Sequence, residues 1–150
     1  MVIVEFKEII IHIDGMDKTG KDSIRRELIR KSGGKYLVIV RSYISQLVYA
    51  RLYNRKINES FFFQQMMTDY LNNIKFIILY TNKDKLTKRF ITNDEQDLLI
   101  EDIDKHKIMF DVIVKEAEHK TGIKFIKINN TNEEINVTVN KIIEVIKKDE

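Results

Sequence analysis

Two short, strongly apolar runs near the N-terminus are joined by a glycine-containing loop and an amphipathic segment. Residues 8–14 (EIIIHID) form a β-branched run that is too short for a normal helix and is typical of a buried strand. Apolar residues then repeat at helical spacing over residues 21–31, until Gly33 and Gly34 end the segment. A wholly apolar run follows at residues 36–40. A strand, a helix and a strand in this order predict a βαβ unit, in which the two strands are parallel.

The remainder of the chain continues this alternation. Further strands are expected at residues 75–80 and 123–128, and helices near residues 44–52, 62–70, 82–89, 99–121 and 135–146. Thr131 and Glu134 have the spacing of a capping box at the start of the last helix. The sequence therefore predicts an α/β three-layer sandwich, with helices on both faces of a mostly parallel sheet of about four to five strands.

Composition narrows the class of protein. A length of 150 residues suits one domain over residues 1–150, and the absence of cysteine excludes disulfides, thiolate metal sites and a cysteine nucleophile. No apolar stretch approaches the roughly 20 residues that span a bilayer, so no membrane association and a cytoplasmic location are expected. A net charge of +3 suits small anionic partners. The charge is too small to indicate nucleic-acid binding, and no stripe of aromatic and basic residues is present.

The loop after the first expected strand carries the pattern Gly15-x-x-x-x-Gly20-Lys21. Glycines let successive amide N–H groups converge, and a helix that begins at Lys21 directs its positive end to the same place. The lysine supplies a mobile cation for β- and γ-phosphates. The pattern predicts a polyphosphate-binding loop over residues 15–23, and an ordinary strand-to-helix turn without a ligand is the alternative.

The residue after Lys21 departs from the usual pattern. A serine or threonine normally follows the lysine and ligates Mg²⁺, but here the residue is Asp22. A carboxylate is also a hard oxygen ligand for Mg²⁺. Ser23 cannot take over the role, because one helical residue turns its side chain by about 100°. Asp22 is therefore the candidate magnesium ligand.

Residues 13–23 (IDGMDKTGKDS) resemble the phosphate loop of the thymidylate kinase family and its phage-type deoxynucleoside monophosphate kinase relatives. That family carries an acidic residue two places after the first glycine and often a basic one next, and Asp17 and Lys18 stand at these positions. Residues 41–49 (RSYISQLVY) are similar to the family's Asp-Arg segment, which is followed by a serine and then a tyrosine. The order and separation of the two segments agree as well. The resemblance implies a P-loop kinase-like fold over most of the chain.

The resemblance also implies a reaction, namely transfer of the γ-phosphoryl of ATP, with Mg²⁺, to a deoxynucleoside monophosphate such as dTMP. The residues implied to bind ATP are Gly15, Met16, Asp17, Lys18, Thr19, Gly20, Lys21, Asp22, Ser23 and Asn130. Those implied to bind the acceptor are Asp17, Arg41, Ser45, Tyr49 and Phe62, with Asp17 on the 3′-hydroxyl and Arg41 on the 5′-phosphate. The catalytic cations implied are Lys18, Lys21, Arg41 and Arg89, the last just before the expected lid.

Several positions depart from the family pattern. Val40 replaces the acid that normally precedes the arginine, which leaves Asp14 and Asp22 as the substitutes that could hold Mg²⁺. A strand and helix usually found before the arginine segment are absent, and residues 92–95 lack the second lid arginine. Tyr49 and Phe62 also fit the packed face of a helix, and His12 fits a buried position in a strand.

Two other functions stay open at this stage. One is a degenerate nucleotide-binding or regulatory protein that no longer turns over, as Asp22 and Val40 would allow. The other is a nucleoside or polynucleotide 5′-hydroxyl kinase, for which Asp17 could act as the base. The resemblance is also consistent with a homodimer, in the cytoplasm of a bacterial host if the chain is phage-encoded.

Overall fold

The computed structural model describes residues 5–16, 19–92, 102–131 and 133–149. Its sheet contains the strands β1 (Ile9–Gly15), β2 (Tyr36–Val40), β3 (Lys75–Tyr80) and β4 (Ile126–Asn129), in the order β2-β1-β3-β4. All three neighbouring pairs are parallel. The predicted parallel sheet is confirmed, with four strands in the described part of the chain.

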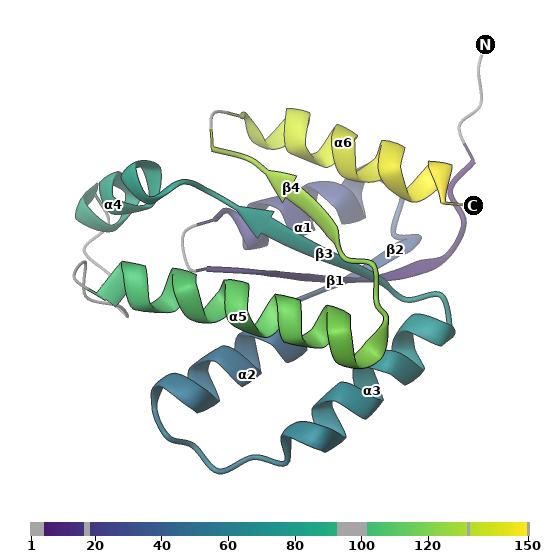
Figure 1. The fold of residues 1–150 in the computed structure, drawn as a ribbon. Coiled ribbons are helices and arrows are strands. Elements are labelled where there is room, and N and C mark those ends of the chain that lie inside the picture. Colours follow the sequence, from purple (N-terminus) through teal and green to yellow (C-terminus); the bar gives the residue numbers. More distant parts are fainter. Residues whose placement is uncertain (1–4, 17–18, 93–101, 132, 150) are drawn as a thin grey trace.

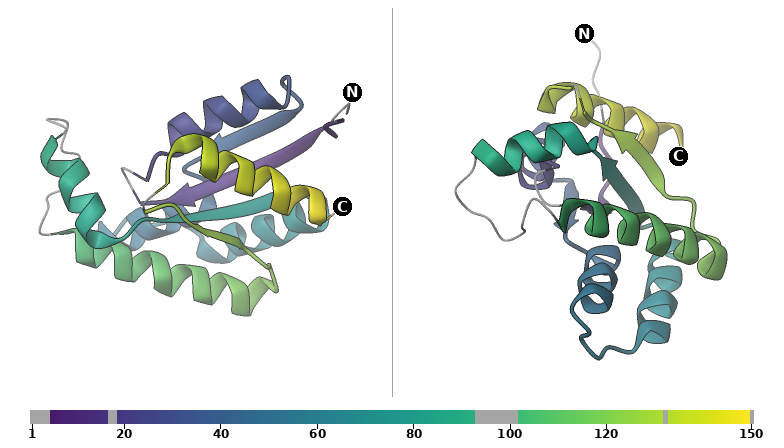
Figure 2. Two further views of the ribbon diagram at one scale, coloured as in Figure 1. Left: turned by 90° about the horizontal axis from the view of Figure 1, so that it is seen from above. Right: turned by 60° about the vertical axis from the view of Figure 1, so that its left-hand side comes forward.

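Helices cover both faces of this sheet. In chain order the helices are α1 (Lys21–Lys31), α2 (Tyr43–Leu52), α3 (Glu59–Leu71), α4 (Lys83–Thr92), α5 (Ile103–Thr121) and α6 (Ile135–Lys148). Figures 1 and 2 show α1 and α6 on one face and α2, α3 and α5 on the other. The arrowheads of β3 and β4 point to the end of the sheet where α4 lies (Figure 1). This is the carboxyl end of the strands, where ligands bind in open parallel sheets.

Each face of the sheet has its own apolar core, because side chains alternate along a strand. Ile11 and Ile13 of β1 pack in the core that includes residues of α1 and α6. Phe76 and Ile78 of β3 belong to the core that includes residues of α2, α3 and α5. The two cores confirm the three-layer α/β sandwich.

Two local expectations were wrong. The last strand begins at Ile126 and not at Ile123, although Ile123 is buried in the core of the α5 face. The capping box at Thr131 is not formed, since α6 begins at Ile135 with Glu134 at its N-cap. The Thr131 hydroxyl instead donates to Asn129 Oδ1 at 2.6 Å and accepts the backbone N–H of Asn82 at 2.9 Å. The threonine thus joins the ends of β3 and β4, a tertiary use that local spacing does not reveal.

The search for membrane-spanning segments covered the described residues. None of their helices combines the length and the apolar character that crossing a membrane needs.

Candidate functional site

The loop between β1 and α1 has the backbone of an anion site. Gly20, the N-cap of α1, has a left-handed φ of +88° and makes no side-chain cap of the helix. The leading N–H groups of a helix have no partner within the helix and bind anions. At Gly15, a Cβ would lie 2.9 Å from the carbonyl oxygen of Leu79, so the loop passes β3 too closely for any side chain.

Lys21 reaches back over this loop. Its side chain is buried, and Nζ donates hydrogen bonds to the carbonyl oxygens of Gly15 at 2.6 Å and Met16 at 2.7 Å. Thr19 Oγ1 donates to the same Met16 oxygen at 2.7 Å. The ammonium group therefore lies against the first half of the loop, where the sequence predicts phosphate. Asp17 and Lys18, which carry several predicted roles, lie outside the described residues.

Asn130 anchors the second half of the loop. Its Nδ2 donates to the carbonyl oxygen of Thr19 at 2.7 Å, and its Oδ1 accepts from Thr81 Oγ1 at 2.6 Å. Asn130 is buried, so its amide supports the loop from behind. A cavity of about 350 Å³ opens beside it, lined by Thr19, Gly20, Ile24, Arg89, Asn130, Glu133, Ile135 and Thr138. The structure thus brings Arg89 and Asn130, which are distant in sequence, to the flank of the loop. Ser23, in contrast, accepts a hydrogen bond from the guanidinium of Arg26 on α1 at 3.3 Å.

Arg41 follows β2 at the same end of the sheet. Its φ of +56° is left-handed, and its N–H donates to the carbonyl oxygen of Ile13 at 3.2 Å. The guanidinium lies 3.7 Å from Asp22 Oδ2 of α1, and both side chains are more than half exposed. Arg41 and Asp22 therefore meet beside the start of α1. No group of three metal-binding side chains occurs among the residues that the structure describes, so a metal here would depend on one or two carboxylates and on the phosphates of a ligand.

Asp14, near the carboxyl end of β1, is buried and forms hydrogen bonds with the start of α2. Its Oδ1 accepts the N–H of Ser42 at 2.8 Å, the N–H of Ser45 at 3.2 Å and the hydroxyl of Ser45 at 2.7 Å. Burial raises the pKa of Asp14, while these hydrogen bonds and the charge of Lys21 oppose the rise. Asp14 thus caps α2, and the Ser45 hydroxyl, predicted to line the acceptor site, is bonded to it.

Tyr49 and Phe62 both take part in aromatic packing. The Tyr49 ring stacks on Tyr53 with centroids 6.0 Å apart and meets the ring of His106 edge-on at 5.4 Å. Phe62 lies edge-on to Tyr43 at 6.1 Å. These contacts are sufficient to explain both positions, and the predicted contacts with an acceptor stay predictions.

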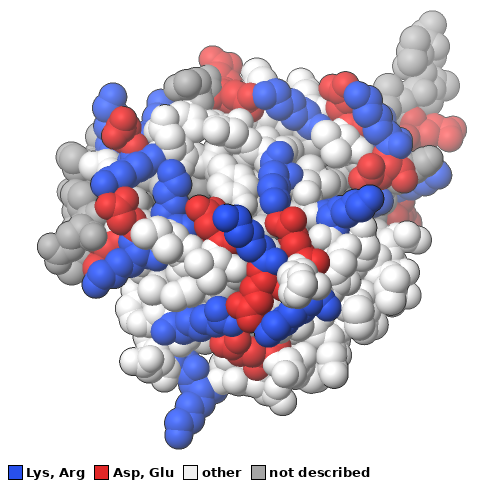
Figure 3. Space-filling view, viewed as in Figure 1, with Lys and Arg blue, Asp and Glu red and all other residues white. Residues whose placement is uncertain are grey.

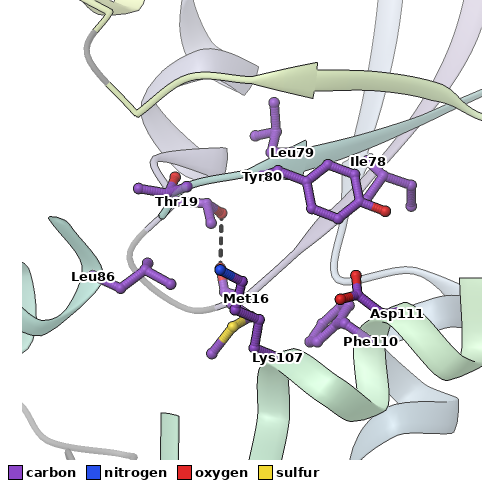
Figure 4. Close-up of a pocket in the computed structure, with 10 residues that line it drawn as sticks. Met16, Thr19, Ile78, Leu79, Tyr80, Leu86, Lys107, Phe110 and Asp111 are labelled. Atoms are coloured by element: carbon purple, nitrogen blue, oxygen red, sulfur yellow. Dashed lines mark hydrogen bonds between the residues drawn. The ribbon is translucent and has the colours of Figure 1, made fainter. Parts of the chain in front are cut away.

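Lys107 of α5 is a residue that the sequence analysis missed. It is half-buried and lines a small cavity of about 20 Å³ with Met16, Thr19 and Asp111, and Figure 4 shows it beside Met16. Across the cavity, burial and the nearby charge of Asp111 raise the pKa of Tyr80 to about 12. The available signal was a lysine on the buried face of a helix, four residues after Ile103.

Basic and acidic side chains are mixed on the face that carries α5 and α6 (Figure 3). Two of the ion pairs there join Lys120 to Glu116 at 2.8 Å and Lys127 to Glu118 at 2.6 Å. This face therefore does not present the strip of one charge sign that binds a nucleic-acid backbone.

Comparison with known proteins agrees with this architecture. No protein-family model matches the chain, and no curated protein matches it. Among solved structures, YorR protein from Bacillus subtilis, in complex with phosphorylated GDP, superposes with a TM-score of 0.77 at 14% identity, over 92% of this chain and 95% of that one. This likeness supports the α/β fold, with helices on both faces of a parallel sheet. Shikimate kinase from Bacteroides thetaiotaomicron aligns over 93% of this chain and 98% of its own with a TM-score of 0.44 at 13% identity.

Proposed function

We propose that this chain is a nucleotide kinase that transfers the γ-phosphoryl group of ATP to the phosphate of a deoxynucleoside monophosphate. The proposal depends above all on one juxtaposition. The start of α1, with glycine at its N-cap and the buried Lys21 as its first residue, lies next to an exposed arginine, Arg41, that follows the neighbouring strand. The first group suits a polyphosphate and the second suits the phosphate of an acceptor.

The proposed chemistry needs little covalent help from the protein. Phosphoryl transfer depends on in-line positioning and on positive charge around the moving group. Lys21 and Arg41 would supply this charge, with Arg89 on the flank of the loop and Lys18 as sequence-based candidates. An acceptor phosphate is already ionised, so no general base is required.

The cavity between α1 and the segment after β4 is the proposed place for the base of ATP. Its walls combine the aliphatic side chains of Ile24 and Ile135 with polar groups of Arg89, Asn130 and Thr138. Apolar walls with a few polar groups are usual for small-molecule sites. The cavity adjoins Gly20, so a base bound there would be continuous with phosphates at the start of α1.

The carboxylate of Asp22 fits a magnesium ligand in type and place. Mg²⁺ in kinase sites is commonly held by one or two carboxylates, by waters and by the nucleotide phosphates. Asp22 is exposed in the first turn of α1, beside the proposed phosphate site. When bound, the ion would neutralise charge between the β- and γ-phosphates.

A transfer assay tests the proposal. The protein is incubated with labelled ATP, Mg²⁺ and a panel of nucleosides, mononucleotides and oligonucleotides. Lys21→Met should lower transfer by roughly 100-fold or more, because it removes a cation from the transferred group. Lys31→Met at the other end of α1, where Lys31 donates to Asn140 at 2.8 Å, is the matched control and should leave transfer unchanged. Nucleoside triphosphate binding without transfer to any acceptor, or no binding at all, would contradict the proposal.

A nucleotide-binding protein without turnover is the second candidate. The ion pair between Arg41 and Asp22 favours this second candidate, because the carboxylate of Asp22 lies against the guanidinium group to which an acceptor phosphate would bind. In the same assay this protein would bind ATP and transfer nothing. Transfer to a hydroxyl acceptor would instead favour the 5′-hydroxyl kinase, whose candidate base Asp17 is outside the described residues.

A further inference from the structure

Three successive residues of strand β1, residues 12–14, form hydrogen bonds to Arg41 and Ser42 in the turn after β2. The carbonyl oxygen of Ile13 accepts the Arg41 N–H at 3.2 Å, and Asp14 Oδ1 accepts the Ser42 N–H at 2.8 Å. His12 Nδ1 is hydrogen-bonded to Ser42 Oγ. Arg41 has a left-handed φ of +56°, which a non-glycine residue keeps only where its surroundings fix it. These contacts are the surroundings that do so.

The start of α2 shows why the Ser42 hydroxyl is available to His12. A serine at an N-cap normally uses its own side chain to accept an N–H from the first turn of its helix. In α2 the third N–H, that of Ser45, is bonded to Asp14 at 3.2 Å, and Ser42 makes no side-chain cap. Asp14 has thus taken over the capping. The hydroxyl of Ser42 is therefore left for the imidazole.

The imidazole of His12 is itself held in place. The side chain is 7% exposed, its ring is parallel to that of Tyr43 at 5.5 Å, and the Phe76 ring lies 5.1 Å away. The Tyr43 hydroxyl donates to Asp69 at 2.7 Å, so the stacking partner is anchored in turn. The adjacent buried positions of β1 are isoleucines, which fill space without a hydrogen bond. The imidazole adds a directed bond to Ser42 at this position.

We propose that His12 is a positioning residue for the acceptor site, because it holds Ser42 and thereby orients Arg41 towards an acceptor phosphate. This inference rests on the proposed function, in which Arg41 binds that phosphate. His12 is buried in the sheet and acts only through the turn. The ATP side of the site is anchored separately, by Lys21 on Gly15 and Met16 and by Asn130 on Thr19. The effect of His12 is therefore confined to acceptor binding.

Three substitutions isolate the hydrogen bond. His12→Phe keeps a ring against Tyr43 and Phe76 but cannot bond to Ser42, and Ser42→Ala removes the same bond from the other side. His12→Asn places an amide near the position of Nδ1 and restores a partner for the hydroxyl. Ser32→Ala is the matched control, because Ser32 is also buried and accepts the N–H of Tyr36 at 3.0 Å, away from Arg41.

Calorimetric titration of each variant with dTMP, dCMP, dAMP and dGMP, and separately with a non-hydrolysable ATP analogue, measures the two sides of the site. For the monophosphate that wild type binds best, His12→Phe and Ser42→Ala should each weaken binding roughly 5-fold, the effect of one hydrogen bond. The double variant should be no weaker than either single one, because both remove the same interaction. His12→Asn should recover part of the affinity, and affinity for the ATP analogue should stay constant throughout.

Two results would overturn the inference while leaving the proposed function intact. One is an unchanged affinity of Ser42→Ala for the monophosphate. This substitution removes a single hydroxyl, so it decides the question even if His12→Phe does not fold. The other is an equal loss of affinity for the monophosphate and the ATP analogue, which would mark a general structural role. A wild-type protein that binds no monophosphate would instead contradict the proposed function, and the inference with it.

Discussion

Replacement of Asp22 by asparagine should tighten the binding of a monophosphate acceptor. The Asp22 carboxylate lies 3.7 Å from the guanidinium of Arg41, and the side chains are 60% and 57% exposed. Two unit charges at this distance attract by about 1 kcal/mol in bulk water, and measured exposed pairs contribute about 0.2–1 kcal/mol. An acceptor phosphate must displace this carboxylate from Arg41. Removal of the charge should therefore improve affinity roughly 1.4- to 5-fold.

The assay is titration with the best-binding monophosphate in the presence of EDTA, so that Asp22 acts only on Arg41. At low salt Asp22→Asn should bind more tightly than wild type. In about 1 M salt the Debye length falls to about 3 Å, shorter than the distance between the two charges, and the difference should disappear. Glu27→Gln is the matched control, because Glu27 is a carboxylate of the same helix that pairs with Arg30.

The reasoning fails if Asp22→Asn binds the monophosphate no better than wild type at low salt. It also fails if the gain persists in concentrated salt, since the effect would then not be electrostatic. A similar gain in Glu27→Gln would show a general response to net charge and not the release of Arg41.

Three further changes test other parts of the site. Gly15→Ala should lower the free energy of unfolding by about 1–3 kcal/mol in denaturant titrations, because its Cβ would lie 2.9 Å from the Leu79 carbonyl oxygen. Lys107→Met should lower kcat roughly 10-fold with unchanged affinity for ADP, because it removes a cation from the cavity that Lys107 lines with Met16 and Thr19. Burial and Asp69 raise the pKa of Tyr43 to about 12, so its contribution to stability is full below pH 10 and is lost as pH rises through 12. Tyr43→Phe should remove this part of the alkaline loss in pH-dependent unfolding.

The sheet and most helices were predictable because their signals are local. Residues 36–40 are a continuous apolar run, and residues 75–80 are apolar after Lys75; both segments are strands with those bounds. The first helix was also predicted with its observed bounds, residues 21–31. The predicted capping box was wrong because Thr131 takes part in a contact between segments that are distant in sequence. Thr131 is used by Asn82 and Asn129, and the contact with Asn82 joins residues 49 positions apart.

The geometry of the candidate site was predictable where it depends on backbone shape and less so where it depends on long-range contacts. The glycines and Lys21 of the proposed phosphate loop follow from the sequence pattern. In the structure Gly15 ends β1, Gly20 is the N-cap of α1 and Lys21 is its first residue, so the predicted strand–loop–helix order is present, while phosphate binding stays a prediction. The use of the Ser45 hydroxyl by Asp14 and the approach of Lys107 to the loop come from packing between elements. The dTMP-like acceptor and the homodimer stay predictions.

The side chains of Asp14 and Val40 lie on opposite faces of the sheet, and Val40 stands where the family pattern has an acid. Val40 pairs with Ile13 and packs against the core of the α1 and α6 face, whereas Asp14 bonds to the start of α2 on the other face. Because neighbouring residues of a strand alternate between faces, Asp14 does not replace a carboxylate at position 40. We therefore expect Asp22 to carry the magnesium requirement. Asp22→Asn should raise the Mg²⁺ concentration for half-maximal transfer, while Asp14→Asn, whose amide oxygen can still accept hydrogen bonds from α2, should leave it unchanged. An equal increase in both variants would show that Asp14 takes part in metal binding.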